Sequence, residues 1–447
     1  ARLSVRIALA AGVAFVGGCR LLRSACLVTS APRRIKRRAL EGERPSPWHG
    51  AATLELLDRL GVKRGHAGTL SRSLAERVVS SLSAETWGEM SVTQETLTEL
   101  GLPKKAAAVL EATVPFCTRV SGAQTSADGS VTKLVLELRD KHKIETVIMR
   151  HDRRTTVCVS SQVGCQMGCA FCATGTMQVV GDLGSSEIVE QLLHANAFET
   201  ALGRSPVRNI VFMGMGEPLN NYEAMCGAVK TMTDINHLGK YAVAQSRVTV
   251  STVGVISRMP QLVRDMPAVS LALSLHAPTQ ELRERIVPAA CHHPLPKLLE
   301  ALDAHVAGCR RPTPSSVGAM VEYVLLAGVN DGDTCATQLG QLMAPRSKDV
   351  MVNLIPYNPG AASSAAPGGG FLAPAHEAVE RFQQIVAAFG VTTRVRRTMG
   401  QDIAGACGQL ALSQSSAASG SVTVEADMED FITWRRRQPP DAKAAVS

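Results

Sequence analysis

The sequence is poor in aromatic residues and has no long apolar stretch. Phe, Trp and Tyr make up 4% of the 447 residues, and 45% of the residues are hydrophobic, as in ordinary globular proteins. A short apolar run at positions 7–18 has the length of a signal-peptide core and cannot cross a bilayer as a helix. We therefore expect no stable association with a membrane, and we expect a monomer.

Acidic residues are missing from the first forty positions, where nine Arg and Lys residues lie. This segment contributes +9 to a total charge of +8, so residues 41–447 carry −1 and net charge does not predict RNA binding by the body. Arg394, Arg396 and Arg397 remain local candidates for phosphate contacts. The Arg- and Ser-rich start, with its apolar run, predicts targeting to an organelle, a plastid rather than a mitochondrion. A cytoplasmic protein is expected if this extension is not a targeting signal.

A second group of closely spaced cysteines is also missing. Twelve cysteines in a chain of this length do not resemble the dense pattern of a disulfide-stapled secreted domain. Only Cys165, Cys169 and Cys172 form a tight group, which favours a metal site or catalysis in a reducing compartment.

Periodicity divides the chain into five parts. Apolar residues at helical spacing predict a small helical domain, strict alternation at 131–138 and 144–149 predicts a β-hairpin, and the polar stretch 114–130 reads as a linker. The predicted parts are a targeting extension (1–50), a helical accessory domain (51–115), a linker with the hairpin (116–154), a core (155–411) and a tail (412–447).

The core alternates short β-branched runs with helical patterns, which is typical of a parallel sheet with right-handed crossovers. Because six or so units are too few for a closed eight-stranded barrel, we predict an α/β fold with a partial (β/α)6-type barrel. The predicted strands are Val157–Ser160, Asn209–Met213, Arg247–Thr252, Val269–Leu275, Met320–Leu326, Val350–Ile355 and Thr392–Val395.

The three grouped cysteines follow the first of these strands in a C-x3-C-x2-C arrangement. Three thiolates on one loop can hold three irons of a cubane cluster and leave the fourth iron open to a ligand. A structural zinc site would require a fourth Cys or His at a second paired spacing. Flanking Gly164 and Gly168 allow the backbone to approach the cluster closely.

This motif, with an aromatic residue before its last Cys, resembles the radical S-adenosylmethionine (SAM) superfamily. The surrounding residues resemble one family within it, the dual-specificity RNA methyltransferases (RlmN/Cfr family), in order from about Leu54 to Leu410. The segments that carry the resemblance are 158–165, 171–175, 213–222, 251–254, 274–277, 353–359, 399–403 and 405–410.

The resemblance implies a 4Fe-4S cluster on Cys165, Cys169 and Cys172, and SAM used twice per turnover. It implies that Gly216 and Glu217 bind the SAM amino group, since a carboxylate is the expected partner of an ammonium. The remaining SAM contacts that it implies are Ser251, Ser274, Leu275, His276 and Asn358.

The resemblance also implies a route for methylating an adenine ring carbon, which is too weak a nucleophile for direct transfer. Cys407 would first take a methyl group from one SAM, and a 5′-deoxyadenosyl radical from a second SAM would activate that methyl group. Cys158 would then release the product by forming a disulfide with Cys407, which an external reductant resets. Glu145 aligns with the proton acceptor proposed for the family, although by itself it reads as an exposed strand residue.

The function expected from the resemblance is transfer of a methyl group to C2 of adenosine in large-subunit rRNA, tRNA or both, with ferredoxin or flavodoxin as reductant. Methylation at C8, or a radical SAM reaction on a substrate other than RNA, is the alternative. A metal-binding or electron-transfer protein, or an enzyme-derived RNA-binding factor, remains possible from the motifs alone, although the former leaves Cys158, Cys407 and Glu217 unexplained.

Overall fold

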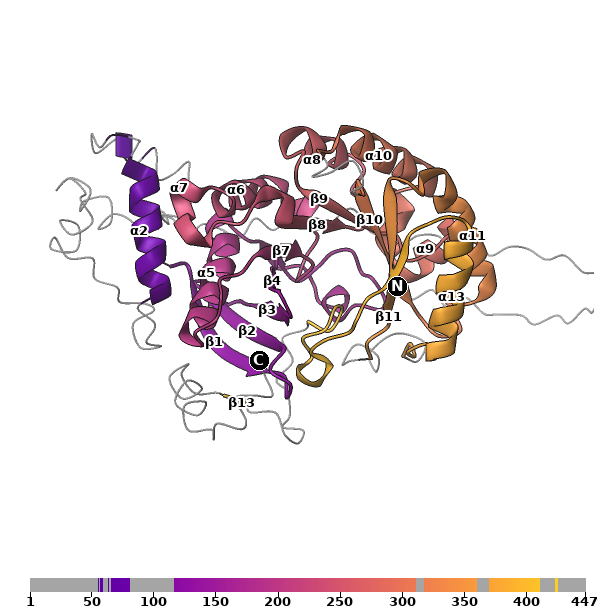
Figure 1. Cartoon of the computed structure of the whole chain (residues 1–447), viewed down its shortest axis with the longest axis horizontal. Helices are drawn as coiled ribbons and strands as arrows, with labels where there is room; N and C mark the ends of the chain where they lie inside the picture. Colours follow the sequence, from indigo (N-terminus) through magenta and orange to yellow (C-terminus); the bar gives the residue numbers. More distant parts are fainter. Residues whose placement is uncertain are drawn as a thin grey trace, which may run out of the picture. The chain divides into compact units, whose positions relative to one another are not determined.

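The computed structural model describes residues 66–80, 116–310, 317–359, 370–410 and 423–424, with a few positions between 55 and 63. An 11-stranded sheet dominates this part of the chain, in the order β12-β11-β10-β9-β8-β7-β4-β3-β2-β1-β13 (Figure 1). Its strands are β1 (Thr118–Thr125), β2 (Val131–Leu138), β3 (Lys143–His151), β4 (Arg154–Cys158), β7 (Asn209–Phe212), β8 (Val248–Thr252), β9 (Ser270–Ser274), β10 (Ala319–Leu325), β11 (Val350–Pro356), β12 (Thr393–Val395) and β13 (Thr423–Val424). A separate pair consists of β5 (Gln162–Val163) and β6 (Gly181–Asp182).

Strands β4, β7, β8, β9, β10, β11 and β12 pair with one another in parallel and form the barrel half of the sheet. Every core strand predicted from the sequence is present. Among the described strands β12 does not pair with β4, so the barrel stays open. The predicted partial (β/α) barrel is therefore confirmed.

The barrel strands are covered on their outer face by helices, several of which form an arc around β9–β12 (Figure 1). On β10, Val321, Tyr323 and Leu325 pack into the core beneath these helices. The alternate residues Glu322 and Val324 face a cavity inside the barrel. The helices are α2 (His66–Ser80), α5 (Ser185–Ala201), α6 (Tyr222–Met232), α7 (Ile235–Leu238), α8 (Met259–Asp265), α9 (Gln280–Ile286), α10 (Leu295–Gly308), α11 (Asp333–Met343) and α13 (His376–Ala388).

The antiparallel half of the sheet contains the predicted hairpin. Strands β2 and β3 pair from Val131 opposite Met149 to Glu137 opposite Lys143, so that hairpin is confirmed. The linker prediction for 114–130 is wrong over Thr118–Thr125, which forms β1 beside β2. Polar side chains and a register shift between Val120 and Gly122 hide the alternation of β1 in the sequence.

Helix α2 is the described part of the predicted accessory domain, and it packs on α5 and α7. Its Leu74, Ala75 and Val79 belong to the same hydrophobic core as the barrel helices. The predicted targeting extension and most of the accessory domain lie outside the described residues, as does the tail apart from Thr423 and Val424, which pair with β1. No helix among the described residues is long and apolar enough to span a membrane.

Candidate functional site

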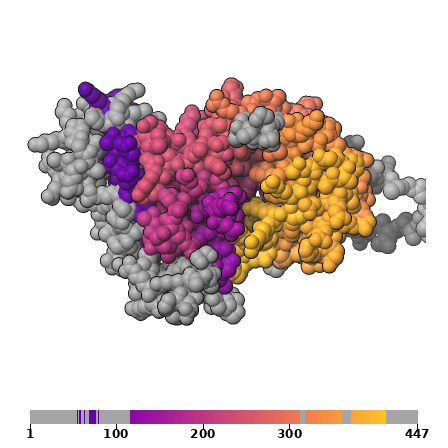
Figure 2. All heavy atoms as spheres, viewed as in Figure 1, coloured from indigo at the N-terminus to yellow at the C-terminus, as the bar shows by residue number. Residues whose placement is uncertain are grey.

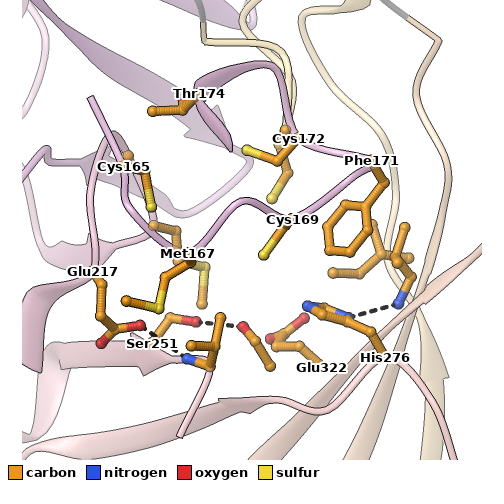
Figure 3. A pocket seen from close by; sticks show the side chains of 18 of the residues that line it. Cys165, Met167, Cys169, Phe171, Cys172, Thr174, Glu217, Ser251, His276 and Glu322 are labelled. Carbon is orange, nitrogen blue, oxygen red and sulfur yellow. Dashed lines mark hydrogen bonds between the residues drawn. The ribbon is translucent and has the colours of Figure 1, made fainter. Parts of the chain in front are cut away.

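The three grouped cysteines surround one cavity at the C-terminal ends of the barrel strands. Cys165, Cys169 and Cys172 all line this cavity, which has a volume of about 140 Å³ and is called the smaller cavity below (Figure 3). The loop that carries them follows β4 and depends on close backbone contacts. A Cβ atom on Gly164, where φ is +81°, would lie 2.2 Å from the carbonyl oxygen of Gln178. The glycine is therefore required for the loop to close.

Burial raises the pKa of all three thiols, and the other thiols of the group add to the effect at Cys165 and Cys169. Thiolates at these positions need a positively charged partner such as iron. Among the described residues, no three His, Cys, Asp or Glu side chains converge closely enough to hold a single metal ion. The thiols of a cubane cluster lie further apart than those of a single-ion site, because each binds a different iron atom, and all three cysteines line one cavity. The thiols thus fit such a cluster.

Glu217 lies in the wall of the same cavity and is 2% exposed (Figure 3). Its Oε1 accepts the amide of Leu219 at 3.0 Å, and its Oε2 accepts the amide of Val253 at 2.9 Å. Burial raises the pKa of Glu217 to about 7 even though these bonds favour the charged form. The ion pairs among the described residues do not include this carboxylate. A ligand ammonium would supply the missing positive charge, and the resemblance predicts the amino group of SAM in this position.

Replacing Glu217 by Gln is expected to weaken SAM binding by roughly 10- to 100-fold, because a charged hydrogen bond in a buried site is lost. Equilibrium dialysis on anaerobically reconstituted protein measures the change, and the melting temperature reports whether the variant still folds. Glu223→Gln is the control, since the Glu223 side chain is 85% exposed on α6. Unchanged SAM affinity in a folded Glu217→Gln protein would remove Glu217 from the site.

Three further predicted residues line the smaller cavity from β8 and β9. The hydroxyl oxygens of Ser251 and Ser274 lie 3.2 Å apart on neighbouring strands. The Nδ1 atom of His276 accepts the amide of Val324 at 3.1 Å, and burial lowers the histidine pKa to about 3. His276 is therefore neutral and carries its proton on Nε2. Together these groups offer hydroxyls and one ring N–H to a polar ligand.

Two other predicted contacts differ in their placement. Asn358 lines the cavity, and its Oδ1 accepts a hydrogen bond from Gln401 at 2.7 Å, so a ligand would meet its amide nitrogen. The side chain of Leu275 is fully buried in the hydrophobic core and does not line the cavity. Its carbonyl accepts a hydrogen bond from Arg283 at 3.1 Å. The side chain of Leu275 therefore does not support its predicted role as a SAM contact.

Cys407 also lines the smaller cavity, although it lies 235 positions beyond Cys172 in the chain. Its loop is held against the cysteine loop by two hydrogen bonds. The amide of Ala173 donates to the carbonyl of Gly408 at 2.7 Å, and the hydroxyl of Thr174 donates to the carbonyl of Leu410 at 2.5 Å. The exposed residue Cys407 therefore lies beside the three grouped cysteines, of which Cys169 is buried and the other two are half-buried.

A second cavity, of about 980 Å³, shares part of its wall with the smaller one and is called the larger cavity below. The shared wall includes Cys407, Glu322, Asn358 and Arg396. At the surface, segments near residues 120–160 and 380–410 adjoin each other (Figure 2), and the amide of Ala127 donates to Asp402 at 2.9 Å. Cys407 can thus be reached from two sides.

Arg396 and Glu322 line both cavities, which the sequence did not predict. Burial by itself would lower the pKa of Arg396, but nearby Cys407, Glu322 and Cys158 raise it. Glu322 accepts a hydrogen bond from Asn353 on one oxygen, and its buried Oε1 has no partner in the structure. The guanidinium of Arg396 thus lies in the cavity wall near Cys407 and Glu322, whereas the sequence suggested a phosphate contact.

Cys158 and Glu145 do not line either cavity, and both are buried. Cys158 pairs with Val147 on the neighbouring strand. Because alternate residues of a strand point to the same face, Glu145 lies on the same face of the sheet as Val147 and Cys158. Cys158 and Cys407 are free thiols in the structure, and burial together with Cys407 raises the pKa of Cys158 to about 12. Glu145 lies 3.2 Å from the Lys133 ammonium, so its reading as an exposed residue is wrong. Its catalytic role remains a prediction.

Comparison with known proteins shows which family and which solved structure this chain resembles. Residues 159–337 match the Radical SAM superfamily. The chain is 40% identical over 323 residues to a probable dual-specificity RNA methyltransferase RlmN from Desulforudis audaxviator, covering 72% of this chain and 94% of that protein. It is 39% identical over 295 residues to a probable RlmN 2 from Protochlamydia amoebophila, covering 66% and 77%. The crystal structure of a radical SAM methyltransferase from Sphaerobacter thermophilus superposes with a TM-score of 0.68 at 35% identity, covering 82% of this chain and 99% of that chain.

Proposed function

The chain belongs to the dual-specificity RNA methyltransferase RlmN family of the radical SAM superfamily, and on that premise we propose that it methylates C2 of adenosine in large-subunit rRNA, tRNA or both. The observation that carries the proposal is the placement of Cys407. Its thiol lines the same cavity as the three grouped cysteines and also lines the larger cavity, which can admit a substrate. Membership of the superfamily implies a 4Fe-4S cluster and SAM.

Cys165, Cys169 and Cys172 would hold the cluster, which together with SAM supplies the one-electron chemistry that an unreactive aromatic carbon requires. Gly216 lets the chain turn tightly before Glu217, since a Cβ at its φ of +98° would lie 2.6 Å from the Gln162 side chain. This turn brings the Glu217 carboxylate into the cavity wall. Glu217 and the polar groups of β8 and β9 then hold SAM in one orientation.

Cys407 would attack the methyl group of one SAM with its sulfur, and S-adenosylhomocysteine would leave. The second SAM would supply the 5′-deoxyadenosyl radical that takes a hydrogen atom from this methyl group, whose carbon then bonds to the adenine. The Arg396 guanidinium, which lines both cavities with Cys407, supplies positive charge near the attacking sulfur. Cys158 would afterwards bond to the Cys407 sulfur, which frees the methylated base and leaves a disulfide. An external thiol reductant then returns both cysteines to thiols.

The reaction product tests the proposal. Protein prepared anaerobically is incubated with methyl-labelled SAM, a low-potential reductant such as reduced ferredoxin or flavodoxin, and large-subunit rRNA or tRNA. Nucleoside analysis is expected to yield labelled 2-methyladenosine. Labelled 8-methyladenosine would assign the alternative ring position, and SAM cleavage without labelled RNA would mean that the substrate is not RNA.

Replacing Cys158 by Ala is expected to trap the enzyme on its substrate. Without the resolving thiol, the bond between Cys407 and the RNA base cannot be broken, so a covalent protein–RNA adduct accumulates while free product falls to background. Denaturing gel electrophoresis detects the adduct. Cys226→Ala, which removes a buried thiol on α6, is the control and should turn over normally. Normal product release by Cys158→Ala would show that another group resolves the intermediate.

We also propose that residues 1–50 direct the protein to an organelle, with a plastid favoured over a mitochondrion. The support is their composition, with nine basic residues and no acid up to position 40. A fluorescent reporter fused after residue 50 should enter the organelle, and diffuse cytoplasmic signal would refute the proposal.

A further inference from the structure

Four arginines line a groove of about 360 Å³ next to the larger cavity, and we call this the arginine groove. They are Arg153, Arg154, Arg208 and Arg247. The lining contains no acidic side chain. All four residues are exposed, although the body of the chain carries a net charge of only −1. The groove is therefore a local concentration of positive charge.

The groove lies at the end of the barrel opposite the three cysteines. Arg154 begins β4, Arg208 directly precedes β7, and Arg247 directly precedes β8. Because these strands are parallel, their N-terminal ends share one rim of the barrel, and the cysteine loop follows the opposite ends. Arg154, Arg247 and Asn209 line both the groove and the larger cavity, so the two spaces are continuous. The larger cavity extends from this rim to Cys407.

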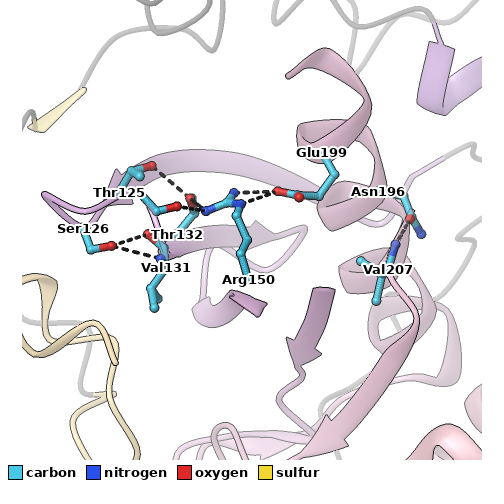
Figure 4. Close-up of polar contacts among 9 residues, drawn as sticks. Thr125, Ser126, Val131, Thr132, Arg150, Asn196, Glu199 and Val207 are labelled. Atoms are coloured by element: carbon cyan, nitrogen blue, oxygen red, sulfur yellow. Dashed lines mark hydrogen bonds and ion pairs between the residues drawn. The ribbon is translucent and has the colours of Figure 1, made fainter. Parts of the chain in front are cut away.

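The guanidinium groups of the groove form no ion pairs with the described carboxylates. None of the described Asp and Glu side chains lies within ion-pair distance of them. Arg150 also lines the larger cavity, but its guanidinium forms an ion pair with Glu199 at 2.6 Å. It also donates a hydrogen bond to the Thr132 hydroxyl at 2.9 Å (Figure 4). Burial lowers the pKa of His151, and the neighbouring Arg154 and Arg396 lower it further, which reflects the positive charge here. The groove thus suits an anionic partner.

We propose that the arginine groove binds the phosphate backbone of the substrate RNA, while the target nucleotide reaches Cys407 through the larger cavity. The inference rests on the proposed function, and it adds the side of the barrel from which the RNA approaches. Arginine suits this role because its planar guanidinium donates two parallel hydrogen bonds to phosphate oxygens. Phosphate contacts position a nucleic acid without reading its sequence, which leaves recognition of the base to the cavity.

The test compares RNA binding by full-length wild type, the double variant Arg208→Ala/Arg247→Ala and Arg285→Ala. Arg285 is the matched control, because it is an exposed arginine at the cysteine end of the barrel. It lies on helix α9, whose Ile286 carbonyl accepts a hydrogen bond from the amide of Ala170 in the cysteine loop at 2.9 Å. The probe is a fluorescein-labelled fragment of large-subunit rRNA, and affinity is measured by anisotropy over a range of salt concentrations. Melting temperatures establish that the variants fold.

The double variant is expected to bind at least about tenfold more weakly, because each lost contact is a charged hydrogen bond. Its plot of log affinity against log salt should be shallower by about two, roughly one for each lost phosphate contact. The KM for RNA should rise while kcat at saturating RNA is retained. Arg285→Ala should bind like wild type.

Two results would overturn the inference. The first is a double variant with wild-type affinity and salt dependence, and the second is a larger loss from Arg285→Ala, which would place the RNA at the cysteine end. Failure of the proposed function looks different. If only the proposed function is wrong, wild type does not methylate the RNA, but the double variant still binds it more weakly than wild type does.

Discussion

Replacing Cys407 by Ala should abolish RNA methylation, with the rate falling at least about 10³-fold, to the background of the assay. The sulfur is the only atom of this side chain that can carry a methyl group from one cavity to the other, and alanine has no nucleophile in its place. The three cluster cysteines are unchanged in this variant, so the visible absorbance of the cluster and the reductive cleavage of SAM should persist. Nucleoside analysis and quantification of 5′-deoxyadenosine measure the two activities separately.

Two further variants sharpen the test. Cys407→Ser keeps a polar side chain but lacks a good nucleophile, so it should be as inactive as Cys407→Ala. Cys335→Ala removes a half-buried thiol on α11 that lines neither cavity, and it should methylate RNA normally. Methylation by Cys407→Ala at more than about a tenth of the wild-type rate would mean that the methyl group does not travel through this cysteine.

Replacing Cys169 by Ala should remove the cluster together with both activities. Each of the three thiolates would hold one iron, so the loss of one leaves a second iron without a protein ligand and destabilises the cluster. Cys169 is 8% exposed and lies between the other two thiols in the loop, where a substitute ligand from solvent cannot easily reach. Iron content and visible absorbance after anaerobic reconstitution should fall to the level of unreconstituted protein.

Cys226→Ala is the matched control for this experiment, because Cys226 is similarly buried at 5% but lies on α6 outside the cavities. Both variants remove a buried sulfur, so a general packing defect would affect their melting temperatures alike. Only Cys169→Ala should lose iron. Full iron content in Cys169→Ala would show that this thiol is not a cluster ligand.

The barrel was predictable from the sequence because its signals are local. Each parallel strand is a short β-branched run between helical patterns, and a strand buried on both faces reads as a continuous apolar run. The same reasoning failed at β1, where polar residues and an irregular register conceal the strand. It also misjudged Glu145, because only the arrangement of β2 and β3 brings Lys133 close enough to bury this carboxylate.

The sequence by itself determined the cysteine loop and the chemistry expected of it, since Cys165, Cys169 and Cys172 lie within eight positions and flanking glycines set their backbone. Only the tertiary structure decided how distant groups meet. The approach of Arg396 to Cys407, the unpartnered oxygen of Glu322 and the shared wall of the two cavities depend on strands packing side by side. The arginine groove arises likewise, because parallel strands bring their N-terminal residues to one rim although more than ninety positions separate Arg154 from Arg247. Spacing along the chain carries no information about such contacts, because they form only when the barrel strands pair and the helices cover them.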